Sequence, residues 1–84
     1  MSVTDDCLIH NEEFSRTFAG PMPLVPQSHL AVVACMDSRI DVFACLGLHL
    51  GEAHVIRNAG GVVTDDVVRS LAISQHKLQT REII

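Results

Sequence analysis

The apolar run at residues 30–34 (LAVVA) constrains the fold of this chain most. An unbroken apolar run of this length predicts a strand covered on both faces, as in the parallel sheets of α/β proteins. Cys35, Asp37 and Arg39 follow directly, two residues apart. Side chains two apart along a strand share a face, so we expect this trio to project together. Open α/β sheets bind ligands at the carboxyl ends of their strands, which makes the trio a candidate site.

After a linker, strand and helix patterns alternate along the rest of the chain. In order they predict a strand, a short helix, a second strand, a longer helix and the start of a third strand, at residues 30–34, 41–48, 53–57, 65–77 and 80–84. The longer helix has Thr64 as its expected N-cap and apolar residues at three- and four-residue spacing. This alternation predicts an α/β fold with a central, mainly parallel sheet flanked by helices.

The amino-terminal segment differs from the rest in its pattern. Residues 5–18 predict a helix with Thr4 as N-cap, and its apolar stripe is narrow enough to need a partner surface. Glycine and three prolines at residues 20–26 then predict an extended linker. We therefore divide the chain into an amino-terminal arm, residues 1–28, and a β-α-β-α-β domain, residues 29–84.

Composition excludes several classes of protein. A net charge of −4 over 84 residues argues against a nucleic-acid or anionic-membrane partner. No apolar run reaches the roughly 18 residues of a membrane helix, and the acidic amino terminus lacks a signal-peptide pattern, so a cytoplasmic location is expected. The three cysteines do not form a disulfide framework, and we expect Cys7 and Cys45 to be buried thiols.

The trio has two interpretations on chemical grounds alone. Cys35 suits zinc, Asp37 could bind the same ion or orient its water, and Arg39 could hold that carboxylate. Alternatively, Cys35 is a small buried residue, while Asp37 caps the following helix and pairs with Arg39 at the surface. The residues of the trio do not by themselves decide between these interpretations.

The turn at residues 58–61 is the second candidate. Gly60 and Gly61 would let a ligand approach the backbone beside a helix amino terminus, or they form a tight strand-to-helix connection. The turn matches neither a phosphate loop nor a dinucleotide fingerprint, which disfavours nucleotide binding. We expect no histidine to bind metal; His54 should be a strand histidine with a hydrogen-bond partner.

Residues 34–39, 54–61 and 64–71 together resemble the β-class carbonic anhydrases, particularly the short bacterial and mycobacterial-type branch. The resemblance implies a zinc cofactor and reversible hydration of carbon dioxide to bicarbonate. Cys35 resembles the first zinc ligand, and Asp37 and Arg39 resemble the catalytic aspartate–arginine pair. In this family the aspartate is either held by the arginine or swings onto the metal, so Asp37 is also a potential ligand.

The same resemblance makes further predictions. Ala59 and Gly60 fall in the turn that shapes the substrate pocket. Family members are dimers or larger, with the amino-terminal helix packed on the neighbouring subunit. In the family, the strand beginning at residues 81–84 leads into a His-x-x-Cys pair that completes the zinc site, and this sequence stops short of it.

We therefore expect the amino-terminal half of such an enzyme, truncated before its remaining ligands. As 84 residues alone it should neither bind zinc tightly nor hydrate carbon dioxide. Two alternatives stay open: a catalytically inactive remnant that dimerises or pairs with another chain, and a related zinc hydrolase acting on a substrate such as carbonyl sulfide.

Overall fold

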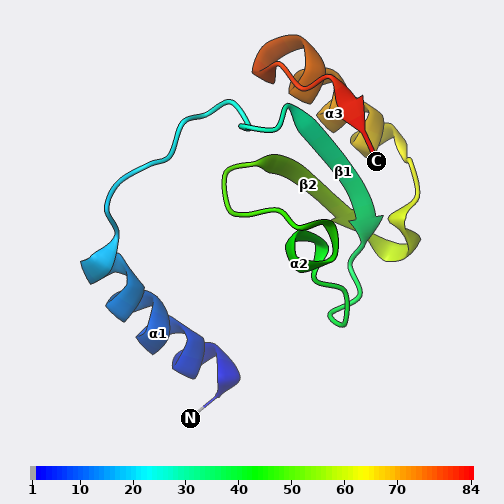
Figure 1. Cartoon of the computed structure of the whole chain (residues 1–84). Helices are drawn as coiled ribbons and strands as arrows, with labels where there is room; N and C mark the ends of the chain where they lie inside the picture. Colours follow the sequence, from blue (N-terminus) through cyan, green and yellow to red (C-terminus); the bar gives the residue numbers. More distant parts are fainter. Residues whose placement is uncertain (1) are drawn as a thin grey trace.

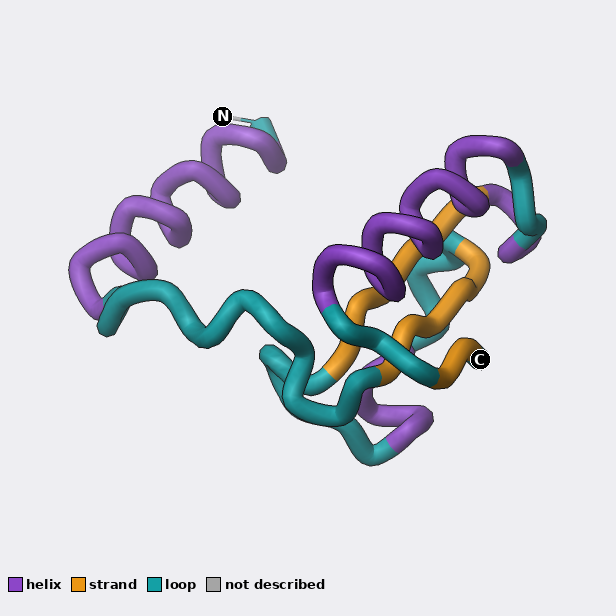
Figure 2. The backbone as a smooth tube through the Cα atoms, turned by 90° about the horizontal axis from the view of Figure 1, so that it is seen from above, coloured by secondary structure: helices purple, strands orange, loops and turns teal. Residues whose placement is uncertain are grey.

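The computed structural model describes residues 2–84 and confirms the α/β fold. The elements in chain order are α1 (Val3–Thr17), β1 (Leu30–Cys35), α2 (Val42–Leu46), β2 (Ala53–Asn58), the 3-10 turn η1 (Ala59–Gly61), α3 (Asp65–Leu78) and β3 (Glu82–Ile83). The strands form one parallel sheet in the order β2-β1-β3. The chain thus moves from β1 outward to β2 and then returns past β1 to β3. Since both crossovers are right-handed by strong preference, α2 and α3 lie on opposite faces of the sheet (Figure 2).

The core is small and aliphatic, as a chain without Trp or Tyr requires. Its buried apolar side chains are Ala31, Val32, Val42 and Val67. Ala31 and Val32 occupy the middle of the central strand β1, where the sequence predicts cover on both faces. The later residues of β1 are only half-buried, because β1 pairs with β3 over two residues alone.

Helix α1 begins earlier than the sequence analysis places it. Its N-cap is Ser2 rather than Thr4: the Ser2 hydroxyl accepts a hydrogen bond from the Asp5 backbone N–H, and the Asp5 carboxylate accepts one from the Ser2 N–H. This reciprocal capping box satisfies two free donors at once, which Thr4 could not do. No residue of α1 is buried, and Figure 1 shows the helix standing away from the sheet. Cys7 is exposed, so the prediction of a buried thiol there is wrong.

The linker is extended, and its last residues are fixed to the sheet. The backbone N–H groups of Gln27 and Ser28 donate to the carbonyl oxygens of Gly51 and Glu52, at 3.0 and 2.9 Å. These bonds hold the end of the linker against the chain that enters β2. The proposed division into residues 1–28 and 29–84 stays a prediction.

Helix α2 is shorter than expected. Asp41 caps its start by accepting from the Ala44 N–H, and Gly47 ends it in the left-handed conformation at φ 66°. A helix of five residues presents only one face to the sheet, so Cys45 is exposed and its predicted burial is wrong.

Helix α3 follows its prediction closely. Thr64 is the N-cap and accepts from the Val67 N–H. The helix ends at Leu78, where Gln79 takes the left-handed conformation. Within residues 2–84 no helix has the length and apolar character needed to cross a bilayer.

Candidate active site

The predicted site residues gather at the carboxyl edge of the sheet. Cys35 ends β1 beside Asn58, which ends β2, because the two strands are parallel and in register there. An open cleft of about 520 Å³ lies at this edge, lined by Cys35, Met36, Asp37, Ser38, Ala59 and Gly60. Two segments that are far apart in the sequence therefore face one cleft, as the strand order requires.

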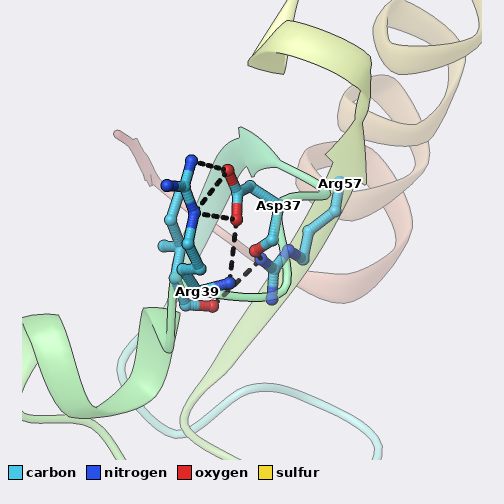
Figure 3. A network of polar contacts seen from close by, with 4 residues as sticks. Asp37, Arg39 and Arg57 are labelled. Atoms are coloured by element: carbon cyan, nitrogen blue, oxygen red, sulfur yellow. Dashed lines mark hydrogen bonds and ion pairs between the residues drawn. The ribbon is translucent and has the colours of Figure 1, made fainter.

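Asp37 and Arg39 meet through a turn rather than along a strand. β1 ends at Cys35, so the expectation that all three side chains share one strand face is wrong in its geometry. The Arg39 backbone N–H donates to Asp37 Oδ1 at 2.8 Å, and its guanidinium donates through Nε to Oδ1 at 3.0 Å and through Nη2 to Oδ2 at 2.6 Å. The result is a bidentate ion pair between two residues of the same turn (Figure 3).

The electrostatics of this pair favour its charged form. Hydrogen bonds from the Arg39 side chain, and then from its backbone N–H, hold the pKa of the Asp37 carboxyl below its ordinary value. The nearby charge of Arg57 acts in the same direction. The same contact raises the pKa of the Arg39 guanidinium. Asp37 is therefore a carboxylate at neutral pH, oriented by Arg39.

The backbone around the Cys35 thiol favours its ionised form. Hydrogen bonds from the backbone of Asp37 and then Gly60 lower the pKa of Cys35, with a smaller contribution from Met36. Partial burial and the Asp37 charge oppose this shift without reversing it. The thiolate is the form that binds metals, so a lowered pKa makes Cys35 chemically suited to that role.

The glycine turn packs closely against β1, while its role as a ligand site stays a prediction. Gly61 has φ 62°, and a Cβ there would lie 3.1 Å from the Ala34 carbonyl carbon and from the Cys35 nitrogen. A glycine is thus needed at position 61 for the turn to pack closely against β1. Gly60, at φ 86°, lines the cleft, and its backbone helps to lower the pKa of Cys35. Ala59 lines the same cleft.

Two residues at the end of β2, Arg57 and Asn58, hold this edge together, and the sequence analysis gave neither of them a bracing role. The Asn58 side chain donates to the Val62 carbonyl oxygen at 2.7 Å and accepts from the Val62 N–H at 2.9 Å, which braces the glycine turn. Arg57 donates to backbone carbonyl groups of the turn after β1. The only signal for either in the sequence is their place at the end of a predicted strand.

The histidines lie apart from this cleft. His54 makes its expected hydrogen bond, through Nδ1 to the Ser74 hydroxyl at 2.6 Å, and His49 lies 3.1 Å from Glu52. Within residues 2–84 no three His, Cys, Asp or Glu side chains form a group that could hold a metal ion. Cys35 and Asp37 have the donor chemistry of a zinc site, but two donors are fewer than the three protein ligands of catalytic zinc sites. The described chain therefore does not form a complete zinc site.

The structure is an α/β sheet with a cysteine and an aspartate–arginine pair at its carboxyl edge. Comparison with known proteins shows which family has this arrangement. Residues 30–84 match the family model described as carbonic anhydrase, and the chain belongs to this family, in its β class. It is 63% identical over 84 residues to β-carbonic anhydrase 1 of Mycobacterium tuberculosis (strain ATCC 25618 / H37Rv), covering all of this chain and 52% of that relative. The chain thus spans about half the length of this curated relative.

Other relatives agree in fold and differ in activity. A crystal structure of carbonic anhydrase from Streptococcus mutans is 49% identical, with a TM-score of 0.88, over 99% of this chain and 51% of that one. A carbon disulfide hydrolase from Saccharolobus solfataricus is 46% identical over 55 residues, covering 66% of this chain and 27% of the relative. The relatives of this chain are therefore named for two different substrates.

Proposed function

We propose that this chain forms the amino-terminal half of a catalytic unit that hydrates carbon dioxide reversibly to bicarbonate. The observation that carries the proposal is the cleft at the carboxyl edge, where the Cys35 thiol and the Asp37–Arg39 pair lie together in a member of this family. A cysteine thiol and a carboxylate are chemically suited to a hydrolytic metal.

Zinc is the proposed cofactor, with Cys35 as one ligand and the remaining ligands supplied from outside residues 2–84. Bound zinc lowers the pKa of its water to about 7 and so supplies hydroxide at neutral pH. In this proposal the Asp37 carboxylate would be the hydrogen-bond acceptor in the cleft, and Arg39 would hold its orientation. Release from Arg39 would free Asp37 to occupy the ligand position itself. Ala59 and Gly60 form the wall against which carbon dioxide would rest.

We propose a homodimer or larger assembly as the working form. α1 buries none of its residues in this chain, and its large apolar side chains are exposed: Leu8, Ile9 and Phe14. A helix with this much apolar surface gains by packing on a second subunit. The cytoplasmic location and the absence of a nucleic-acid partner stay predictions from composition.

A hydrolase of carbon disulfide or carbonyl sulfide is the second candidate. It is favoured by the 46% identity with carbon disulfide hydrolases over 55 residues. Both reactions place a nucleophilic oxygen on the carbon of a small linear molecule, so Cys35 and Asp37 would have the same roles. Release of hydrogen sulfide from carbonyl sulfide, measured beside carbon dioxide hydration, separates the two activities.

The natural gene product that contains these residues is the protein to test. Its intact mass, its zinc content and its carbon dioxide hydration in stopped flow should be measured together, for wild type and for Cys35→Ser. Cys45→Ser is the matched control, since Cys45 is exposed on α2 away from the cleft. We expect one zinc per chain and hydration that is lost in Cys35→Ser alone. A folded protein without zinc and without hydration would favour the inactive interaction module instead.

A further inference from the structure

We propose that Arg57 is a positioning residue, which holds the turn at residues 35–40 and thereby fixes the Asp37–Arg39 pair at the mouth of the cleft. Its bearing on catalysis rests on the proposed function, while its effect on the pair does not. Arg57 lies at the penultimate position of β2 and comes to this turn from the neighbouring strand.

Arg57 makes all of its hydrogen bonds to backbone carbonyl groups. Nε donates to the Cys35 oxygen at 2.8 Å, and Nη2 donates to the oxygens of Asp37 and Ile40 at 2.8 and 3.0 Å. Figure 3 shows its guanidinium beside the turn, on the other side from Arg39. One side chain from β2 therefore joins the end of β1 to the start of α2, since Ile40 precedes the N-cap of that helix.

These carbonyl groups have few other partners. The turn follows directly after the last residue of β1, so its carbonyl oxygens have left the ladder of the sheet. Within the turn, one bond joins backbone to backbone, from the Ile40 N–H to the Asp37 oxygen at 3.1 Å. Backbone carbonyl groups need hydrogen-bond donors, and Arg57 supplies one to each of three, two of which belong to the half-buried residues Cys35 and Asp37. Without it, three bonds from backbone N–H groups would remain to hold the turn: Ile40 N–H to the Asp37 oxygen, Arg39 N–H to Asp37 Oδ1, and Met36 N–H to the Asn58 oxygen.

The shape of the guanidinium suits this task. Arginine presents several N–H donors in a rigid plane, so Nε and Nη2 reach carbonyl groups at separate points with fixed directions. Lysine has a single nitrogen at the end of a flexible stem and could serve only part of this set. The Asp37 residue is consequently held twice, at its carbonyl oxygen by Arg57 and at its carboxylate by Arg39.

The Nε–H proton of Arg39 reports on the pair directly. Its ¹⁵N–¹H NMR signal and its exchange with water should be followed in the full chain, for wild type, Arg57→Met and Arg57→Lys. Arg69→Met is the matched control, because Arg69 is an exposed arginine of α3 with no side-chain hydrogen bond among residues 2–84. Amide protection in α3 monitors folding in every sample.

In Arg57→Met we expect the Arg39 Nε–H to exchange roughly tenfold faster, as for loss of one charge-assisted hydrogen bond, with α3 still protected. Arg57→Lys should restore this protection only in part, and Arg69→Met should not change it. If Arg57→Met loses amide protection in α3, it has not folded properly. The Arg39 Nε–H exchange in Arg57→Lys then tests the proposal instead. An unchanged Arg39 signal in a folded Arg57 variant would overturn the proposal. Neither zinc nor activity enters this readout, so its failure and a failure of the proposed function are distinguishable.

Discussion

Arg39 binds the Asp37 carboxylate from two directions, through its backbone N–H at 2.8 Å and through guanidinium Nη2 at 2.6 Å. The backbone bond needs only the turn, whereas the guanidinium bond needs the arginine side chain. A contact between residues two apart forms without long-range folding, but its orientation toward the cleft depends on β1, β2 and the bonds of Arg57.

Removing the guanidinium should change the titration of Asp37. We expect the pKa of Asp37 to lie below its ordinary 3.8 in the folded chain and to rise in Arg39→Met. Because the folded pKa is depressed, the stabilisation from this carboxylate is present above the unfolded pKa and is lost as pH falls through the folded value. NMR titration of the Asp37 side-chain carbon measures this. Arg16→Met, on α1, should leave the Asp37 titration unchanged.

The Cys35 thiol should be unusually reactive toward alkylation at neutral pH. In a chain with Cys7→Ser and Cys45→Ser, the pH midpoint of iodoacetamide reaction at Cys35 should lie below the ordinary thiol value of 9.0. Backbone N–H groups of Asp37 and Gly60 stabilise the thiolate, and urea should abolish the shift by removing them. A midpoint that is the same with and without urea would contradict stabilisation of the thiolate by these N–H groups.

Two glycines have nearly the same backbone conformation, so substituting each by alanine distinguishes backbone strain from a steric clash of the added Cβ. Gly61→Ala and Gly47→Ala both place alanine in the left-handed region, at φ 62° and 66°. That conformation costs about 1–2 kcal/mol in either case. At Gly61 the added Cβ also meets the backbone of Ala34 and Cys35 at 3.1 Å, whereas at Gly47 nothing lies within 4 Å. Urea unfolding should show a larger loss of unfolding free energy for Gly61→Ala than for Gly47→Ala. Equal losses would contradict close packing of Gly61 against β1.

Ser74 should matter for stability because it is buried between two polar partners. Its hydroxyl lies 2.6 Å from His54 Nδ1 and 2.7 Å from the Thr80 hydroxyl, and its residue is 2% exposed. Ser74→Ala leaves both partners without this bond and should reduce the free energy of unfolding by about 1–3 kcal/mol. Ser70→Ala, one turn earlier on α3, is the control and should have a small effect. A small effect of both would contradict a stabilising network.

Much of the fold is readable from local patterns. The apolar run at residues 30–34 predicts the central strand, and Thr64 followed by an apolar stripe predicts α3 with its cap. The predicted start of α1 at Thr4 is wrong, because the cap is set by the reciprocal bonds between Ser2 and Asp5. The exposure of Cys7 and Cys45 was not readable, because it depends on what each short or isolated helix packs against.

Some residues of the candidate site can likewise be predicted from the sequence, and others cannot. Cys35, Asp37 and Arg39 stand out through their residue types and spacing, and the cleft brings the first two together with Ala59 and Gly60. The role of Arg57 was hidden, because it binds backbone carbonyl groups 17 to 22 residues away, and carbonyl groups leave no trace in a sequence pattern.

Carbon dioxide hydration, measured in stopped flow with zinc content, tests the central claim most directly. The chain of 84 residues should be compared alone and joined to the carboxyl-terminal half of the mycobacterial relative, with and without Cys35→Ser. The account predicts neither tight zinc nor hydration for the 84 residues alone, and one zinc with hydration for the joined protein, both lost in Cys35→Ser. A folded joined protein without zinc, or an 84-residue chain that binds zinc and hydrates carbon dioxide by itself, would contradict it.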